Sequence, residues 1–194
     1  MNQSFIQLAS GSPRRLELLA QLGVECRVHP VDIDETPADD ERPSDYVRRM
    51  AREKAVAAEN ELGNHVPILA ADTVVVIDDC PLGKPRDREH GLDMLGRLSG
   101  RSHQVMTAVA TRTSGGERLM LNTTEVRFRK IAPAERAAYW DTGEPSDKAG
   151  GYAIQGRAAV FIEHIAGSYS GVMGLPLFET AQLLREAGVP VLGP

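Results

Sequence analysis

Hydrophobic and polar residues follow two different periods along this chain, and the periods separate predicted strands from predicted helices. Apolar residues at alternate positions or in short β-branched runs predict strands, whereas recurrence every three or four positions predicts helices. We expect strands at Phe5–Ala9, Glu25–Pro30, Pro67–Ile77, Gln104–Arg112, Arg118–Lys130 and Ala159–Ile165. We expect helices at Pro13–Leu22, Ser44–Leu62, Arg88–Leu98, Pro133–Thr142 and Leu177–Ala187.

The order of these elements indicates an α/β fold. Strands and helices alternate in the first half, and a hairpin with its turn at Ser114–Gly115–Gly116 enters in the middle. This order predicts a mixed central sheet flanked by helices. The chain shows no internal repeat, so residues 1–194 are expected to form a single domain. The glycine-rich stretches 143–156 and 166–174 are expected to be loops, where functional residues concentrate.

Composition limits the classes of function. The chain has 194 residues, of which 42% are hydrophobic and 25% charged, with a net charge of −5. It is apolar enough for a core, and it is not basic enough for a broad nucleic-acid surface. Its two cysteines suggest no disulfide framework, and no apolar run is long enough to cross a membrane. We therefore expect a cytoplasmic protein whose partners include neither a nucleic-acid polymer nor a membrane.

Two arginines stand where cations are unfavourable. In LASGSPRRLELL, Ser12 is placed to cap a helix whose first residues are Pro13, Arg14 and Arg15. A helix N-terminus carries partial positive charge and favours anions. One interpretation is that both arginines point to solvent at a small cost. The other is an anion site, in which Ser10 and the following turn donate hydrogen bonds and an arginine binds phosphate oxygens.

A lysine interrupts the apolar face of the long predicted helix. Lys54 lies near the middle of the face formed by Val47, Met50, Ala51, Ala55, Ala57, Ala58 and Leu62. A lysine facing a core needs a partner or a route to water. Its ammonium group could reach past the apolar residues to solvent. Alternatively, it points into a cleft that holds a negative ligand.

Asp72 interrupts the apolar run VPILAADTVVVI. A carboxylate there is costly unless it is paired, bound to metal or at a strand end. A turn at Asp72–Thr73 would explain it, but the apolar run resumes at once with Val74. A carboxyl end of a sheet strand is a usual place for metal or base chemistry. We therefore favour a functional role for Asp72.

Three other residues are weaker candidates by themselves. Gln155, in the glycine-rich stretch DKAGGYAIQG, has an amide that could pair with the edge of uracil or thymine. Glu35 lies among the carboxylates of DIDET, and Lys84 lies in the predicted turn GKP. Each of the three could equally belong to an ordinary surface loop.

Together these stretches resemble the Maf family of nucleoside triphosphate pyrophosphatases. The matching pieces, in order, are SGSPRR, DIDET, REKA, AADT, GKP, LSG followed by HQVMT, DKAGGYAIQG and GSYSGVMGLPL. SGSPRR and DKAGGYAIQG are similar to the branch that acts on dTTP and UTP, and the branch preferring 7-methyl-GTP departs at both. One departure is Gly171, which stands where an asparagine is expected.

The resemblance implies a fold and a set of site residues. It implies two lobes with the substrate cleft between them, as in the Maf and inosine triphosphate pyrophosphatase type of structure, often as a homodimer. Asp72 matches the catalytic proton acceptor, and Glu35 is its expected partner in binding a divalent metal, Mg²⁺ or Mn²⁺. Positions associated with substrate choice or lining the cleft are Arg14, Thr73, Gln155, Ser10, Arg15, Lys54 and Lys84.

The implied reaction is hydrolysis of dTTP and UTP, or of modified pyrimidine triphosphates, to the monophosphate and pyrophosphate. Two alternatives remain open at the level of sequence. One is a regulator of septum formation that binds the nucleotide without cleaving it. The other is a pyrophosphatase directed at purine or modified nucleotides, with similar chemistry. Turnover and base preference, respectively, discriminate these alternatives from the main hypothesis.

Overall fold

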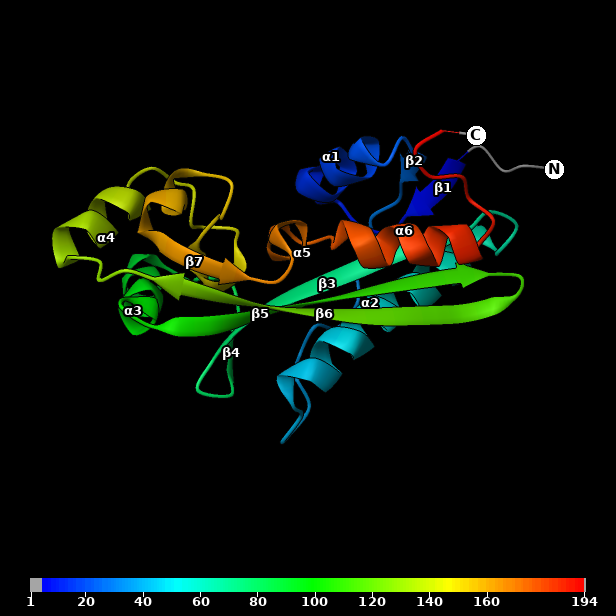
Figure 1. Cartoon of the computed structure of the whole chain (residues 1–194). Coiled ribbons are helices and arrows are strands. Elements are labelled where there is room, and N and C mark those ends of the chain that lie inside the picture. The colour runs from blue at the N-terminus through cyan, green and yellow to red at the C-terminus, as the bar shows by residue number, and fades with distance from the viewer. Residues whose placement is uncertain (1–4, 194) are drawn as a thin grey trace.

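A seven-stranded mixed sheet forms the centre of the molecule in the computed structural model, which describes residues 5–193 (Figure 1). The strands are β1 Phe5–Leu8, β2 Glu25–Val28, β3 Ile68–Ile77, β4 Cys80–Leu82, β5 Ser102–Thr113, β6 Gly116–Phe128 and β7 Ile162–Ala166. Their order is β2-β1-β3-β5-β6-β7, with β4 paired to β3. The pairs β1–β2 and β1–β3 are parallel, and the remaining pairs are antiparallel.

The helices surround this sheet. They are α1 Pro13–Gln21, α2 Pro43–Leu62, α3 Arg88–Leu98, α4 Pro133–Trp140, α5 Tyr169–Met173 and α6 Leu177–Glu186, with 3₁₀ helices η1 Ala149–Gly151 and η2 Arg157–Phe161. In Figure 1, α1 and α6 lie above the sheet and α2 below it, while α3, α4 and β7 lie at the opposite end of the long strands. The predicted mixed α/β sheet flanked by helices is confirmed.

Separate hydrophobic cores define two lobes that share the long strands β3, β5 and β6. In the first lobe, α1 and α6 pack on one face of β3 through Leu69 and Ala71, and α2 packs on the other face through Ala70 and Val74. In the second lobe, Val75 and Ile77 pack with residues of α3, α4 and β6. The same strand therefore links both cores, and its middle residues lie at the junction.

Strand β3 changes its neighbour along one edge. Its first residues, Ile68 and Leu69, pair with β1, and Val75–Ile77 pair with β4. Along the other edge, β5 pairs without interruption from Ile68 to Val76. In the described part of the chain, residues 70–74 consequently have a strand neighbour on one side only, because β1 pairs before them and β4 pairs after them. This open edge allows a cavity to reach the middle of the sheet.

Most of the predicted elements are confirmed with small shifts at their ends, but three expectations are wrong. The expected strand Ala159–Ile165 begins only at Ile162, because residues 157–161 form η2, in which Ala158 and Phe161 are buried three positions apart. The expected loop 166–174 contains α5. Asp72 lies in the middle of β3, not at its carboxyl end.

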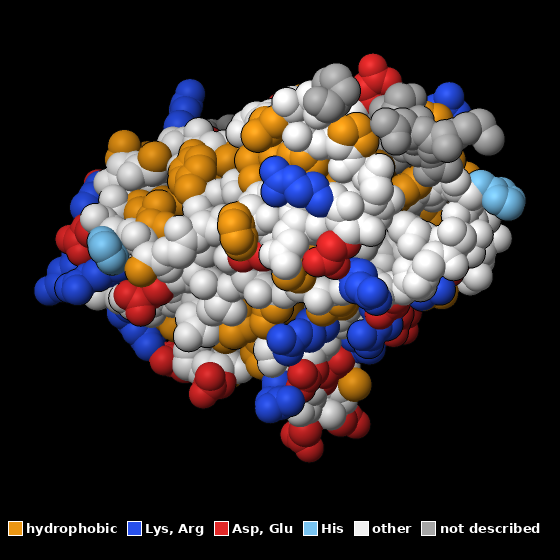
Figure 2. All heavy atoms as spheres, turned by 45° about the vertical axis from the view of Figure 1, so that its right-hand side comes forward, with side chains coloured by type: hydrophobic (Ala, Val, Ile, Leu, Met, Phe, Trp, Pro, Cys, Tyr) orange, Lys and Arg blue, Asp and Glu red, His pale blue; other side chains and the backbone are white. Residues whose placement is uncertain are grey.

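Surface charges are mixed on the face shown in Figure 2, where basic and acidic side chains lie interspersed and form no single broad basic area. This arrangement agrees with the net charge of −5. Within residues 5–193, every helix is too short or too polar to span a bilayer.

Candidate active site

A cavity of about 560 Å³ opens between the two lobes. Its size lies in the range of small-molecule sites. The structure brings all nine site residues expected from the sequence to its wall: Ser10, Arg14, Arg15, Glu35, Lys54, Asp72, Thr73, Lys84 and Gln155. They come from the connection between β1 and α1, the start of α1, the loop after β2, α2, β3, the turn after β4 and the loop after η1. Segments far apart in the sequence thus converge on one space.

The open edge of β3 explains why two consecutive residues both reach this cavity. Asp72 lies in the row of side chains that faces α2, whereas Thr73 lies in the row that contains Ala71 and Val75 on the opposite face. Inside a fully paired sheet, such neighbours would line different compartments. Among the described residues 5–193, no strand covers residues 70–74 on the cavity side, so both side chains border the same space.

Lys54 joins the two predicted metal-binding carboxylates. Its Nζ lies 2.7 Å from Oδ1 of Asp72 and 2.6 Å from Oε1 of Glu35. The side chains of Lys54 and Asp72 are only 12% and 14% exposed, so Lys54 does not extend to bulk water. Of the two interpretations from the sequence, the lysine that points into a cleft is therefore the one observed.

Glu35 is charged under most conditions. Burial raises the pKa of its carboxyl, but Lys54, with help from Lys84 and Arg15, outweighs burial and lowers the pKa below its usual value. Tyr46 donates a hydrogen bond from Oη to the Glu35 carbonyl oxygen at 2.9 Å. This bond fixes the backbone that carries Glu35 in an otherwise irregular loop.

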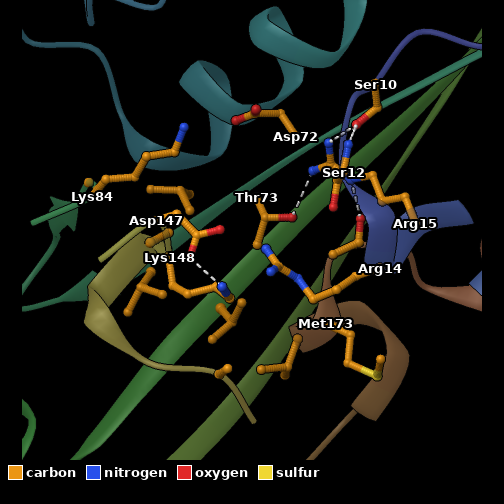
Figure 3. Close-up of a pocket in the computed structure, with 18 of the residues that line it drawn as sticks. Ser10, Ser12, Arg14, Arg15, Asp72, Thr73, Lys84, Asp147, Lys148 and Met173 are labelled. Atoms are coloured by element: carbon orange, nitrogen blue, oxygen red, sulfur yellow. Dashed lines mark hydrogen bonds and ion pairs between the residues drawn. The ribbon is translucent and has the colours of Figure 1, made fainter. Parts of the chain in front are cut away.

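Arg15 is held in place by oxygen atoms from three segments. Its Nε donates to the carbonyl of Gly174 at 2.8 Å, and its Nη1 donates to Oγ of Ser10 at 3.0 Å. Its Nη2 lies 3.4 Å from Oγ1 of Thr73, and Figure 3 shows these two side chains pointing toward one another. Burial is the main factor that lowers the pKa of Arg15, with Arg14 adding to the effect and Asp72 opposing it.

A chain of hydroxyl groups sets the hydrogen-bond direction at Thr73. Thr107 on β5 donates from Oγ1 to the carbonyl of Gly171 at 2.7 Å, and the Oγ1 atoms of Thr73 and Thr107 lie 2.9 Å apart. Because the single proton of Thr107 is used for Gly171, Thr73 must donate to Thr107. Thr73 therefore presents only acceptor capacity to Arg15 and to the cavity.

The start of α1 lacks the usual neutralising groups. Ser12 occupies the N-cap position as expected, but its side chain makes no capping bond, and the first turn contains no acidic residue. Across the described residues 5–193, the side chains of Arg14, Lys84 and Gln155 have no hydrogen-bond or ion-pair partner. Figure 3 shows Lys84 on the opposite side of the cavity from α1 and its arginines. These groups are available to a ligand.

Sequence reasoning missed Lys148, Asp147, Tyr46 and Thr107. Lys148 lines the cavity with its side chain 15% exposed and forms an ion pair with Asp147. Both residues belong to DKAGGYAIQG, so the motif itself contained the signal. Thr107 is a buried hydroxyl in an apolar strand, the same kind of interruption that identified Asp72. The cavity wall thus holds five cations, Arg14, Arg15, Lys54, Lys84 and Lys148, against three carboxylates.

The glycine at position 171 has a structural explanation. A Cβ atom there would lie 2.8 Å from Oδ1 of Asn122 and 3.1 Å from Cβ of Ser168. Asn122 lies on β6 and donates to Oε1 of Glu179 at 2.7 Å. The amide of Asn122 therefore occupies the space beside α5, and a larger residue at 171 would have to displace it.

The carboxylates at this site suit a hard divalent cation. Glu35 and Asp72 converge on one ammonium group, so their oxygens are close enough to approach a common ion. Mg²⁺ and Mn²⁺ bind through a few carboxylates together with substrate phosphates and water. In the part of the chain that the structure describes, no cluster of three or more His, Cys, Asp or Glu side chains could hold a metal. Two carboxylates would fill only part of the coordination of such an ion and would leave the other positions to substrate phosphates and water.

Comparisons with known proteins identify the family of this chain. The model of the Maf-like protein family matches residues 5–187. A protein named dTTP/UTP pyrophosphatase from Alkalilimnicola ehrlichii is 55% identical to this chain, and the alignment covers 93% of this chain and 92% of the relative. A protein of the same name from Nitrosomonas europaea is 52% identical to this chain, and the alignment covers 96% of each. The protein of that name from Saccharophagus degradans is 51% identical, and the alignment covers 98% of this chain and 92% of the relative.

Solved structures give a partial likeness. A nucleoside-triphosphatase / dITP/XTP pyrophosphatase from Mycobacterium abscessus aligns over 65% of this chain and 75% of its own, with a TM-score of 0.45 and 19% identity. This likeness adds nothing to the assignment, which rests on the family model and on the sequence relatives. The chain belongs to the Maf family.

Proposed function

We propose that this protein hydrolyses dTTP and UTP to the corresponding monophosphate and pyrophosphate. The observation that carries the proposal is Lys54, which holds Asp72 and Glu35 together on the wall of a cavity rich in cations. Relatives about half identical over nearly the full chain are named dTTP/UTP pyrophosphatase, which supports the choice of substrate.

The triphosphate group lies among the cations of the cavity wall, of which Arg14 and Lys84 have no hydrogen-bond or ion-pair partner within the described residues 5–193. Arg14 and the backbone N–H groups at the start of α1 bind it from one side, because a helix N-terminus favours anions. Lys84 binds it from the opposite side of the cavity (Figure 3), and Lys148, which is paired with Asp147, adds a further cation on the same wall. Ser10 and Arg15 are already joined by a hydrogen bond, so they form a fixed surface for phosphate oxygens.

Asp72 is the proton acceptor. Lys54 donates to its Oδ1, which fixes the carboxylate and leaves Oδ2 to accept a proton from water. The water oxygen forms a bond to the α-phosphorus, and the bond from this phosphorus to the bridging oxygen breaks, so that pyrophosphate leaves. A bound Mg²⁺ or Mn²⁺, held by Glu35 and Asp72, would supply water activation and neutralise charge on the phosphoryl oxygens. Lys54 and Arg15 neutralise part of the same developing charge from the protein side.

Base choice is assigned to the loop that carries Gln155. Its unpaired amide can donate to a carbonyl and accept from the N–H of uracil or thymine. Thr73 presents only a hydrogen-bond acceptor to the cavity, so it favours a hydrogen-bond donor of the substrate beside it. Arg14, in the first turn of α1, lines the same cavity as Gln155 and adds to substrate choice.

The test is a turnover assay with purified protein and Mg²⁺ or Mn²⁺. The substrates are dTTP, UTP, CTP, GTP, 7-methyl-GTP and ITP, and the products are separated by chromatography. We expect pyrophosphate from dTTP and UTP at much higher kcat/KM than from the others. Binding of dTTP without any cleavage would overturn the proposal and favour the nucleotide-binding regulator. Preference for ITP or GTP would favour the purine-directed alternative.

Assembly and compartment are further proposals that rest on the family. A homodimer would appear in size-exclusion chromatography with light scattering as about twice the mass of the chain. For the compartment we propose the cytoplasm, because free thiols such as those of Cys26 and Cys80 are typical of a reducing environment. Cell fractionation with the protein tagged at its C-terminus tests it.

A further inference from the structure

The turn that carries Gln155 is anchored on both sides by two residues that do not line the cavity. Tyr139 lies on α4 and is 4% exposed, and Glu144 lies in the loop that follows α4. The N–H of Ala153 donates to Oη of Tyr139 at 3.2 Å, two residues before Gln155. The N–H of Arg157 donates to Oε2 of Glu144 at 3.0 Å, two residues after it.

The two anchors are one connected unit. Tyr139 donates from Oη to Oε1 of Glu144 at 2.7 Å, so the hydroxyl that accepts from Ala153 also orients the carboxylate. The backbone N–H of Glu144 donates to Oγ1 of Thr142 at 3.2 Å, and Thr142 donates in turn to the carbonyl of Tyr139 at 2.7 Å. Burial and the neighbouring carboxylate of Glu144 raise the pKa of Tyr139, so its proton remains available for this bond.

The backbone of Gly156 packs directly against the carboxylate. A Cβ atom at this position would lie 2.4 Å from the carboxyl carbon and both oxygens of Glu144. A side chain there would have to push the carboxylate away and break the bond to Arg157. The lack of a side chain at Gly156 therefore allows the turn to pack closely against the Glu144 carboxylate.

We propose that Tyr139 and Glu144 are positioning residues for base recognition, which clamp the turn 153–158 and thereby fix the Gln155 amide at the cavity. This inference rests on the proposed function, in which Gln155 reads the pyrimidine. Within the described residues 5–193 the amide of Gln155 has no hydrogen-bond partner that orients it, so its direction depends on the backbone that carries it. A base edge is read only when donor and acceptor lie in register with it.

The test uses isosteric variants. Tyr139→Phe removes the hydroxyl, and Glu144→Gln replaces one acceptor oxygen with a donor that faces the N–H of Arg157 or the Tyr139 hydroxyl. Glu163→Gln on β7 is the matched control, because its exposed carboxylate pairs with Arg127 away from the turn. The measurements are kcat/KM for dTTP, UTP and CTP, hydrogen exchange of peptides covering 153–158, and the thermal midpoint.

We expect either variant to reduce discrimination between UTP and CTP at least fivefold and to raise KM for UTP more than it lowers kcat. Exchange in 153–158 should become at least tenfold faster while exchange in β3 and β5 is unchanged. Since the two residues act as one unit, the double variant should resemble each single variant. The control should match the wild type in all three measurements.

Three results would overturn the inference. The first is unchanged exchange in 153–158, and the second is faster exchange with UTP-to-CTP discrimination intact. The third is an equal loss of kcat for every nucleotide together with a lower thermal midpoint, which indicates a general structural role. If the wild-type protein cleaves no pyrimidine triphosphate, the proposed function fails by that result alone. The exchange measurement then still decides whether Tyr139 and Glu144 hold the turn.

Discussion

Asp72 and Thr73 are neighbours in β3 whose side chains leave opposite faces of the strand, yet both border one cavity. Asp72 contacts Lys54 of α2, and Thr73 contacts Thr107 of β5 and Arg15 of α1. This arrangement exists because β1 ends before these residues and β4 begins after them. A proposed proton acceptor and a residue proposed to select the substrate are thus joined by a single peptide bond.

Replacing Asp72 by asparagine should abolish turnover and preserve the fold. Asparagine has nearly the same shape, and its amide oxygen can still accept from Lys54, but it cannot take a proton from water. We expect kcat to fall by about 10³-fold or more, the usual scale for loss of a general base. Steady-state assays and the thermal midpoint measure both effects. Asp78→Asn, at an exposed turn, is the control, and near-normal turnover in Asp72→Asn would remove Asp72 from the mechanism.

Removal of divalent metal should stop the reaction. Two carboxylates on one wall bind an ion weakly unless the substrate adds ligands, so dialysis against EDTA should abolish turnover and added Mg²⁺ or Mn²⁺ should restore it. Glu35→Gln should raise the Mg²⁺ concentration for half-maximal rate by about tenfold or more, because one anionic ligand is lost. Glu53→Gln, a partly exposed carboxylate on α2, should leave this concentration unchanged. Full activity in EDTA would contradict the metal assignment.

Replacing Gln155 by leucine should alter base preference more than phosphate binding. The loss of two neutral hydrogen bonds, each about 1 kcal/mol, predicts a fall in kcat/KM for dTTP and UTP of about 10- to 100-fold. Hydrolysis of CTP should change much less, so discrimination decreases. Gln182→Leu, at an exposed position on α6, is the control. An equal loss for every nucleotide would show that Gln155 does not read the base.

Position 171 should be energetically coupled to Asn122. Gly171→Ala introduces a Cβ that meets Oδ1 of Asn122, and such overpacking typically costs about 1–3 kcal/mol. Asn122→Ala removes the obstructing amide, so the double variant should be more stable than the sum of the single effects predicts. Urea unfolding of the four proteins gives the coupling free energy. Additivity within about 0.5 kcal/mol would mean that the two side chains do not compete for space.

Stability should fall in mild acid because of His103. Burial lowers the pKa of this imidazole to about 4, its Nε2 lies 2.8 Å from Oη of Tyr152, and the rings of Phe128 and Tyr152 pack against it. The unfolded chain binds the proton more readily than the folded chain does. His103 therefore contributes fully to the free energy of unfolding above about pH 6.5, and this contribution is lost as the pH falls toward 4.

At pH 5 this loss should be about 2 kcal/mol relative to neutral pH. The free energy of unfolding in urea at pH 7.5 and 5.0 measures it for the wild type and for His103→Gln. The variant should show a pH dependence smaller by about that amount. Tyr152 remains protonated throughout, since burial raises its pKa, and it does not contribute. An equal pH dependence in both proteins would exclude His103 as the cause.

The sequence by itself determined the order of most helices and strands and the positions that depart from their surroundings. Lys54 on an apolar helix face, Asp72 in an apolar strand, and Arg14 and Arg15 at a helix start are visible because each breaks a rule that acts over a few residues. The resemblance of the motifs to one family then predicted that all of these residues belong to one site. The structure places them around one cavity.

Only the tertiary structure decided which of these residues touch. Arg15 bonds to Gly174, 159 positions away, and Lys54 joins Glu35 to Asp72 across three elements. The open edge of β3 depends on where β1 and β4 end, and no local period marks it. The sequence did not reveal the clamp of Tyr139 and Glu144 either, because neither residue departs from the local pattern of its own segment. Hydrophobic periodicity records which side of an element is buried, whereas a site requires partners that only folding brings together.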